Sequence, residues 1–219
     1  GEIIRRELAD AGFAGRLILR GDHEIALRGA ITGAGGILIA GTGSICCGVD
    51  ENGRFARVGG WGHLIDDGGS GYAIGRDALA LTVRGEDGRA PRGALHDAVL
   101  RRTRAADAHG IVEFTYHGAS KAEVAALAAE VLRLAAQGDA QSAAILRREA
   151  EELRIMVSAF ARELAIVQPR VALMGGLLAE ENIYRETVCA ALSGTAQPVH
   201  PMHDALWGAA QLAFEALEE

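Results

Sequence analysis

Short apolar runs fill the first third of the chain and give way to helical spacing further on. The runs cover 36–40, 45–49 and 54–58 and are separated by glycine-containing turns, which is typical of short strands. Asp50-Glu51-Asn52-Gly53 between the last two runs predicts a β-hairpin. From about residue 71 onward, apolar residues recur at spacings of three and four, which predicts helices.

The same pattern predicts the remaining elements. Helices are expected over 2–11, 22–29, 71–84, 94–106, 121–136, 142–167, 180–192 and 204–217. Single strands are expected over 16–20, 170–174 and 197–200. A hairpin followed by helices that alternate with single strands predicts an α/β fold with a mixed β-sheet flanked by helices. The strand and helix within 1–32 lack nearby partners, so we expect them to end a preceding lobe, with 33–219 as the main lobe.

Composition and charge exclude several classes of function. Apolar residues make up 49% and charged residues 23% of the 219 residues, which is ordinary for a globular protein. No apolar run reaches the roughly 18 residues of a membrane-spanning helix, and the N-terminus lacks the pattern of a secretion signal. The net charge of −7 disfavours nucleic acid as a partner. Cys46, Cys47 and Cys189 are too few and badly spaced for a zinc tetrad or a disulfide framework, so we expect a reducing cytoplasm.

Glycine and lysine depart from the average composition. The 29 glycines are about double the usual ~7% share, so many positions need a positive φ or a close backbone approach. Lys121 is the only lysine. The residues before it, Gly118-Ala119-Ser120, do not match the phosphate loop that ends in Gly-Lys-Ser/Thr, so that kind of nucleotide site is not expected.

Two glycine turns follow predicted strands. Gly41-Thr42-Gly43-Ser44 follows the run 36–40, and backbone N–H groups freed by glycines, with the two hydroxyls, favour an anion. Taken alone, this tetrapeptide is more simply explained as a plain hairpin turn. Gly175-Gly176 follows the strand 170–174 and precedes a helix. Because open α/β sheets bind ligands at the carboxyl ends of strands, two such turns on neighbouring strands indicate a nucleotide.

A third glycine cluster surrounds a tryptophan. Gly59-Gly60-Trp61-Gly62 is followed by Asp66 and Asp67 and then by Gly68-Gly69-Ser70-Gly71. A tryptophan beside carboxylates suits a sugar, whose C–H faces lie on aromatic rings while its hydroxyls donate to the carboxylates. A glycine-rich surface loop with solvated acids is the alternative.

Three other features have simple structural explanations. Asp22 can act as the N-cap of its helix. His200, His203 and Asp204 resemble a metal cluster, but Pro201 breaks any helical register, which favours capping by Asp204. Cys46-Cys47 on a strand is most simply buried packing.

Taken together, the motifs resemble a known family. Gly41-Thr42-Gly43-Ser44, then Gly59-Gly60-Trp61-Gly62-His63, then Asp67-x-Gly-Ser70-Gly71-Tyr72 resemble the N-acetylglucosamine kinases. These enzymes belong to the BadF/BadG/BcrA/BcrD ATPase family within the sugar kinase and actin superfamily. The similarity extends to Met174-Gly175-Gly176 and to Asp204-Ala205-Leu206-Trp207-Gly208, and it spans roughly 16–215.

The resemblance implies a ribonuclease-H-like (actin-like ATPase) lobe over 33–219, with ATP, Mg²⁺ and an amino sugar as ligands. By position it implies Asp22 as the base that accepts the proton of the sugar hydroxyl, Gly41, Thr42, Gly43 and Ser44 at the ATP phosphates, Gly175, Gly176 and Ala135 near the adenosine, and Gly60, Trp61, Gly62 and Asp67 at the sugar. No metal-ligating residue of this chain is implied.

The sequence departs from the family pattern at three points. The first phosphate loop, an Asp-Gly-Gly-Gly-Thr type of segment that also supplies a Mg²⁺ carboxylate, is not found, so most of the N-terminal lobe is expected to be missing. The usual Gly-Asp-Glu-Gly-Ser is replaced by Asp66-Asp67-Gly68-Gly69-Ser70, which leaves the sugar specificity open. Gly21-Asp22-His23 matches the pattern around the base only loosely.

The function expected from the sequence is ATP-dependent phosphorylation of an amino sugar such as N-acetylglucosamine or glucosamine. Two alternatives stay open: an ATPase activator of an acyl-CoA reductase or dehydratase, which needs cysteines for a bridging iron–sulfur cluster, and a non-catalytic sugar sensor. We expect a cytoplasmic homodimer with no nucleic-acid or membrane partner.

Overall fold

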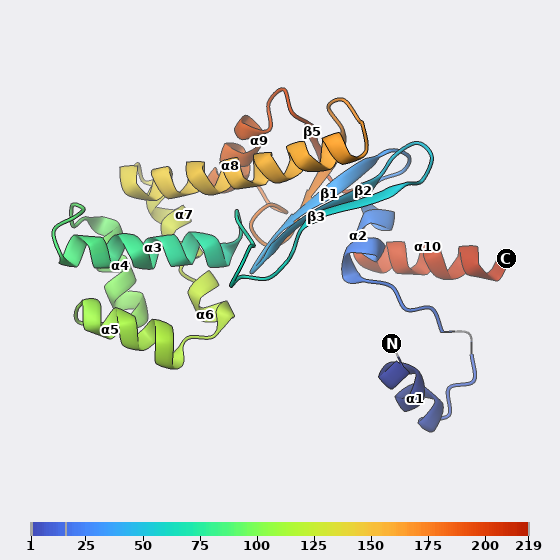
Figure 1. The fold of residues 1–219 in the computed structure, drawn as a ribbon, viewed down its shortest axis with the longest axis horizontal. Coiled ribbons are helices and arrows are strands. Elements are labelled where there is room, and N and C mark those ends of the chain that lie inside the picture. Colours follow the sequence, from blue (N-terminus) through green and yellow to red (C-terminus); the bar gives the residue numbers. More distant parts are fainter. Residues whose placement is uncertain (1, 16, 219) are drawn as a thin grey trace.

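The computed structural model describes residues 2–15 and 17–218 and contains a mixed sheet with helices on both faces (Figure 1). The strands are β1 (Gly35–Ala40), β2 (Ser44–Val49), β3 (Phe55–Gly59), β4 (Arg170–Met174) and β5 (Gln197–Val199). Their order across the sheet is β3-β2-β1-β4-β5. β1, β2 and β3 are antiparallel neighbours, whereas β4 lies parallel to both β1 and β5. The mixed α/β sheet expected from the sequence is therefore confirmed.

The hairpin predicted at 50–53 joins β2 to β3. Asp50 Oδ1 accepts hydrogen bonds from the backbone N–H groups of Asn52 and Arg54, at 2.8 and 2.9 Å. Gly53 has φ of 77°, a backbone conformation that glycine adopts without strain. This turn chemistry fixes the register in which Val49 pairs with Phe55.

The two faces of the sheet bury different residues because side chains alternate along each strand. On one face, Ile37, Cys47 and Ala172 pack against α2 (Asp22–Ala30), which in turn packs against α10 (Ala205–Glu218). On the other face, Leu38 and Cys46 belong to the large core beneath α3 (Gly71–Glu86) and α8 (Ala140–Glu163). Both cysteines are fully buried, which confirms that they serve as packing residues.

The helical region differs from the sequence prediction in detail. It comprises α4 (Ala94–Thr103), α5 (Ala108–Glu113), the π-helical turn η1 (Phe114–Gly118), α6 (Lys121–Ala125), α7 (Ala128–Ala136) and α9 (Ile183–Ala191). The single helix predicted over 121–136 is wrong, because the chain turns at Ala126 and Leu127. Leu127 is 1% exposed, so packing of this side chain in the core outweighs the local helical preference.

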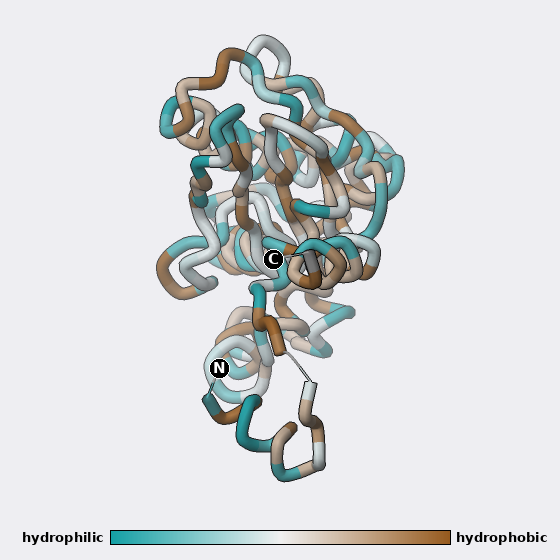
Figure 2. Tube along the Cα trace, turned by 90° about the vertical axis from the view of Figure 1, so that its right-hand side faces the viewer, coloured by the Kyte–Doolittle hydropathy of each residue, from teal (hydrophilic) through white to brown (hydrophobic). Residues whose placement is uncertain are grey.

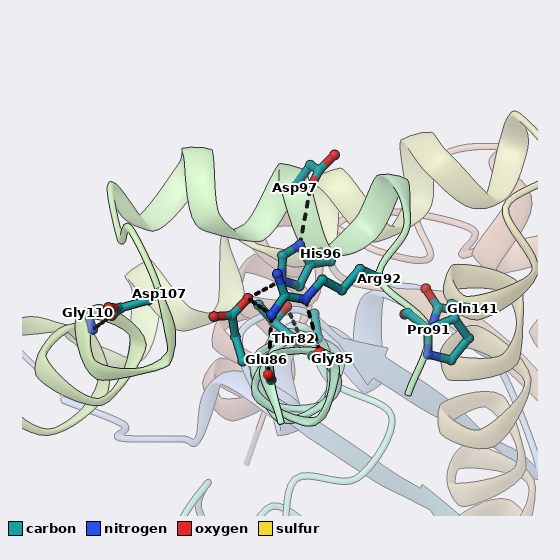
Figure 3. Close-up of polar contacts among 11 residues, drawn as sticks. Thr82, Gly85, Glu86, Pro91, Arg92, His96, Asp97, Asp107, Gly110 and Gln141 are labelled. Carbon is teal, nitrogen blue, oxygen red and sulfur yellow. Dashed lines mark hydrogen bonds and ion pairs between the residues drawn. The ribbon is translucent and has the colours of Figure 1, made fainter. Parts of the chain in front are cut away.

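Polar contacts around the buried His96 join α3 to α4 and to the segment between them (Figure 3). His96 Nε2 lies 2.7 Å from Glu86 Oε1, and His96 Nδ1 lies 3.1 Å from Asp97 Oδ1. Arg92 Nη2 approaches the same Glu86 oxygen at 3.3 Å, and Arg92 Nε donates to Gly85 O at 3.1 Å. These contacts pair the charges where α3 ends and α4 begins.

Three helix or strand boundaries also need correction. Residues 17–20 form no strand, and they line a cavity beside Leu212 and Ala216 of α10 instead of pairing with the sheet; Arg16 lies outside the described residues. α8 ends at Glu163, before Ala165 and Gln168, whose φ angles of 54° and 47° are not helical. α9 starts at Ile183 and not at 180, because Asn182 Oδ1 caps the N–H groups of Tyr184 and Arg185.

The N-terminal helix α1 (Glu2–Asp10) lies outside the main body (Figures 1 and 2). No residue of α1 is buried, and Arg5 Nη1 donates to Leu17 O at 3.3 Å. The helix α2 within 1–32 packs on the same sheet as 33–219. The division of the chain at residue 32 stays a prediction.

Candidate functional site

The two glycine turns lie side by side at one edge of the sheet. β1 and β4 are parallel neighbours, with Ile39 opposite Met174, so the turns that follow both strands emerge at the same edge. Leu177 N donates to Ala40 O at 3.1 Å. Gly175 has φ of 88°, and a Cβ added there would lie 2.4 Å from Ala40 O. The expectation that the turns follow neighbouring strands is confirmed.

The turn at 41–44 is held by the segment at 67–72. Gly71 N donates to Gly41 O at 2.8 Å, and Tyr72 N donates to Thr42 O at 3.4 Å. Ser44 is buried and its hydroxyl donates to Gly68 O at 2.7 Å, so this hydroxyl is already used in the structure. Within the described ranges, the N–H groups of Thr42 and Gly43 donate no hydrogen bond, which leaves two donors for an anion.

Asp67 lies under this turn and not on an open surface. It is 2% exposed and has φ of 65°, a left-handed backbone conformation. A Cβ added at Gly43 would lie 2.8 Å from Asp67 Oδ2. Lys121 Nζ donates to the same Asp67 oxygen at 2.8 Å and is 34% exposed. The sequence reasoning noted Lys121 as the sole lysine but missed this pairing.

A second buried carboxylate supports the same segment. Glu149 on α8 is 2% exposed, and its Oε2 accepts the N–H of Gly69 at 2.7 Å. The buried Tyr184 donates its hydroxyl to Gly69 O at 2.8 Å. Burial, with a smaller contribution from the nearby Glu149 charge, raises the pKa of Tyr184 well above its usual value. Sequence periodicity placed Glu149 on a helix but gave no sign that it reaches this segment.

Trp61 stands at the surface on the far side of the same loop. It is 66% exposed, and the Arg57 guanidinium lies 4.8 Å from its ring centroid. Gly60 and Gly62, with φ of 71° and 97°, set the backbone on either side. Asp66 Oδ2 accepts the N–H of Trp61 at 3.4 Å.

A cavity of about 420 Å³ opens between this loop and α8. Trp61 and Ile65 line it from the loop, and Met156 lines it from α8. Asp66 and Glu152 add two carboxylates. Asp67 does not line this cavity, so the structure separates the surroundings of the tryptophan from those of Asp67.

Asp22 is the first residue of α2 and is exposed. The N-cap is Gly21, whose N–H donates to Glu24 Oε1 at 3.3 Å, so the suggestion that Asp22 caps the helix is wrong. The Asp22 carboxylate makes no hydrogen bond or ion pair with the part of the chain that the structure describes. It is therefore free to act on a ligand.

The turn at Gly175-Gly176 is braced from α9. Arg185 is 4% exposed; its Nη1 donates to Leu178 O, and its Nε donates to Glu181 Oε1 at 2.9 Å. Ala135 lies elsewhere, in a cavity of about 480 Å³ formed by α7, α8 and α9. Neither glycine turn lines that cavity. The expectation that Ala135 lies near the adenosine therefore stays a prediction.

The structure gives no support for a metal held by side chains alone. No group of three or more His, Cys, Asp or Glu among the described residues is placed to hold a metal ion. Asp204 Oδ1 accepts the N–H of Trp207 at 2.8 Å, which confirms that Asp204 caps α10. Cys46 and Cys47 are buried, so their thiols are not available at the surface to bind an iron–sulfur cluster shared between two chains.

Comparison with known proteins identifies the family. The chain matches the BadF/BadG/BcrA/BcrD ATPase family over residues 6–213 and belongs to it. It is 36% identical over 184 residues to the N-acetylmuramic acid/N-acetylglucosamine kinase of Clostridium acetobutylicum, covering 82% of this chain and 60% of that protein. It is 29% identical over 155 residues to the N-acetyl-D-glucosamine kinase of Dictyostelium discoideum, covering 68% of this chain and 48% of that protein. The chain thus spans about half to three fifths of the length of these relatives.

Solved structures confirm the actin-like ATPase fold. A protein from Chromobacterium violaceum, provisionally assigned as an N-acetylglucosamine kinase, superposes with a TM-score of 0.76 at 30% identity, covering 95% of this chain and 71% of that one. A glucokinase from Streptomyces griseus, solved with glucose and AMPPNP, superposes with a TM-score of 0.60 at 17% identity, covering 95% of this chain and 70% of that one. In the part of the chain described, no helix is both long and apolar enough to cross a lipid bilayer.

Proposed function

We propose that this chain carries the sugar site and the second phosphate and adenosine turns of an ATP-dependent amino-sugar kinase. The observation that carries the proposal is the pair of glycine turns, brought together at the carboxyl ends of β1 and β4. Ligands bind at this edge in open α/β sheets. The kinase names of the two relatives favour N-acetylglucosamine or a similar amino sugar as the acceptor.

The nucleotide binds through backbone donors in this proposal. The free N–H groups of Thr42 and Gly43 suit phosphate oxygens, and the exposed Thr42 hydroxyl adds a donor. Gly176 has open space where a Cβ would stand, so a ligand can approach its backbone. This donor set fits an anion. Mg²⁺, when bound, neutralises charge on the phosphates and is held mainly by their oxygens.

The sugar lies beside Gly60, Trp61 and Gly62. The exposed indole of Trp61 offers a face for the C–H groups of the sugar. The oxygen of one sugar hydroxyl attacks the γ-phosphorus, and the bond from that phosphorus to the ADP oxygen breaks. Asp22 accepts the hydroxyl proton. Asp67 lies against Gly43, under the phosphate turn, and the sugar contact that the family resemblance implies for it is part of this proposal.

The proposal is tested by binding and turnover together. Isothermal titration with Mg-ATP, and ADP release with N-acetylglucosamine, N-acetylmuramic acid, glucosamine and glucose, are measured on the full-length protein. We expect nucleotide binding and ADP release that depends on an amino sugar. Sugar binding without nucleotide binding would instead favour the sensor, and absence of both would refute the site.

Asp22→Asn tests the assigned base. We expect a loss in turnover of roughly 10²–10⁴-fold with sugar binding unchanged, because a positioned base contributes about that much. Asp10→Asn on the exposed helix α1 is the matched control and leaves turnover unchanged. Turnover of Asp22→Asn equal to that of the control would remove Asp22 from the mechanism.

A homodimer in the cytoplasm is part of the same proposal. The exposed apolar side chains Leu206, Phe214 and Leu217 on α10 supply surface for self-association. The three free cysteines agree with a reducing compartment. Sedimentation analysis at micromolar concentration distinguishes the dimer from the monomer.

A further inference from the structure

Lys121 is placed at the phosphate turn by the way α6 packs. α6 crosses α3 at Gly75, where an added Cβ would lie 2.0 Å from Val124 O. The backbones therefore approach more closely than a larger residue allows. Ser120 caps α6 together with Glu123, so Lys121 is the first helical residue and points back along the loop at 67–71.

The surroundings of Lys121 Nζ suit an anion. Besides its 2.8 Å contact to Asp67, the ammonium lies 3.2 Å from the position of an added Gly43 Cβ, so it sits against the backbone of the turn. An ammonium has three N–H donors, and Asp67 is its only partner among the described residues. With its side chain 34% exposed, Lys121 keeps donors for a ligand.

The negative charge around the site explains why an ammonium group at this position would be useful. The chain carries a net charge of −7, and Asp66 and Asp67 add negative charge at the tryptophan cavity and under the phosphate turn. A nucleoside triphosphate brings about four more negative charges, and phosphoryl transfer depends on their neutralisation. Arg57, a cation on the tryptophan side of the loop, is engaged with the Trp61 ring and with Gly60 O.

We propose that Lys121, anchored by Asp67, donates a hydrogen bond to the terminal phosphate of the nucleotide bound at the 41–44 turn. This inference rests on the proposed function and adds a catalytic residue to it. Besides the sugar contact proposed above, Asp67 then has a second role. Its charge-assisted hydrogen bond holds the Lys121 ammonium in place at the turn. Lys121 serves the phosphate side of the site, whereas Trp61 serves the sugar side.

The single lysine allows a direct test by chemical labelling. The chain is treated with an amine-selective succinimidyl ester, and acylation of Lys121 is followed by peptide mass spectrometry, which separates it from the N-terminal amine. We expect Mg-ATP to slow the acylation at least about tenfold, and adenosine or N-acetylglucosamine alone to leave it unchanged. Protection by the sugar alone, with none by Mg-ATP, would overturn the inference.

Variants separate phosphate contact from support of Asp67. Lys121→Met should weaken Mg-ATP binding about ten- to hundredfold, the usual effect of losing a charge-assisted hydrogen bond, and Lys121→Arg should largely restore it. Because Lys121→Met leaves Asp67 buried without its partner, the double variant Lys121→Met/Asp67→Asn is also titrated, with thermal unfolding as a folding check. We expect the double variant to bind Mg-ATP as weakly as Lys121→Met.

The outcomes also separate this inference from the proposed function. Wild-type affinity for Mg-ATP in the double variant would show that Lys121 only neutralises Asp67, and the inference would fail while the nucleotide site stands. If the wild-type full-length protein binds no Mg-ATP by calorimetry, the proposed function fails and the inference fails with it.

Discussion

At the scale of single residues, burial controls the protonation of two adjacent thiols. Cys46 and Cys47 point to opposite faces of β2 and are both fully buried. Burial raises the pKa of Cys46 well above its usual value. Burial also raises the pKa of Cys47 to about 12, against an opposing effect of Arg57 and with a further increase from Glu24. Both thiols therefore stay protonated in the folded protein at pH values where the unfolded chain ionises.

These shifts predict alkaline destabilisation. The stabilising contribution is fully present below the unfolded pKa of about 8.5 and is lost as the pH rises toward the folded value of about 12 for Cys47. Each thiol lowers the free energy of unfolding by about 1.4 kcal/mol per pH unit above its unfolded pKa. Urea unfolding from pH 7 to 11 should show a steeper decline for wild type than for Cys46→Ala/Cys47→Ala. Parallel curves above pH 9 would contradict this.

The sequence reveals single residues when their function requires an unusual backbone. The turns at 41–44 and 175–176 and the surroundings of Trp61 were found because glycine at these positions leaves a visible pattern. The contacts Lys121–Asp67 and Glu149–Gly69 were not found, because 54 and 80 residues separate their partners. The spacing of residues within a helix does not show which of its charged side chains contacts a loop that is distant in the sequence.

At the scale of elements, α2 and α10 cross at glycines. A Cβ added at Gly208 would lie 2.0 Å from Ile25 O, and one added at Gly29 would lie 2.1 Å from Asp204 O. The two helix backbones are therefore in direct contact at this crossing. Because α2 carries Asp22, the crossing also helps to fix the position of the proposed base.

Gly208→Ala should lower the free energy of unfolding by about 1–3 kcal/mol, because the added methyl group overpacks the crossing. Gly118→Ala is the control, since an added Cβ there meets nothing within 4 Å; its effect should stay within about 0.5 kcal/mol. Urea unfolding with comparison of midpoints at constant m-value measures both. Equal midpoints would mean that the helices do not approach this closely in solution.

Element types were predicted better than element boundaries. The strands β1 to β5 and the long helix α8 follow from periodicity, because burial on one or both faces dictates their residues. The break at 126–127 and the π-helical turn η1 were not predicted, because core packing and not local preference determines them. The strand predicted over 16–20 is wrong for the described residues 17–20, because an apolar run becomes a strand only where it pairs with a sheet edge.

At the scale of the whole molecule, the fold was predictable because the strand order and the glycine turns of the candidate site point to the same arrangement. An antiparallel meander β1–β3 extended by β4 and β5 in parallel brings two turns to one edge, and the glycine pattern marks those same turns. The position of α1 was not predictable from the sequence. Its periodicity is that of an ordinary amphipathic helix, with Ile3 and Ile4 on one side, yet these residues are 70% and 50% exposed.

This exposure predicts that α1 contributes little to the stability of the rest of the chain. A helix of 9 residues without buried contacts is marginal in water, where isolated helices need about 12–15 residues. We expect the amides of α1 to exchange with deuterium within seconds, as in a free peptide, while those of the central strand β1 stay protected.

Deleting 2–12 should change the free energy of unfolding by less than about 0.5 kcal/mol. Deleting 209–218 of α10, which lines the cavity beside 17–20, should destabilise the fold strongly. Slow exchange in α1, or a loss above about 1 kcal/mol on its deletion, would mean that α1 packs on the main body in solution.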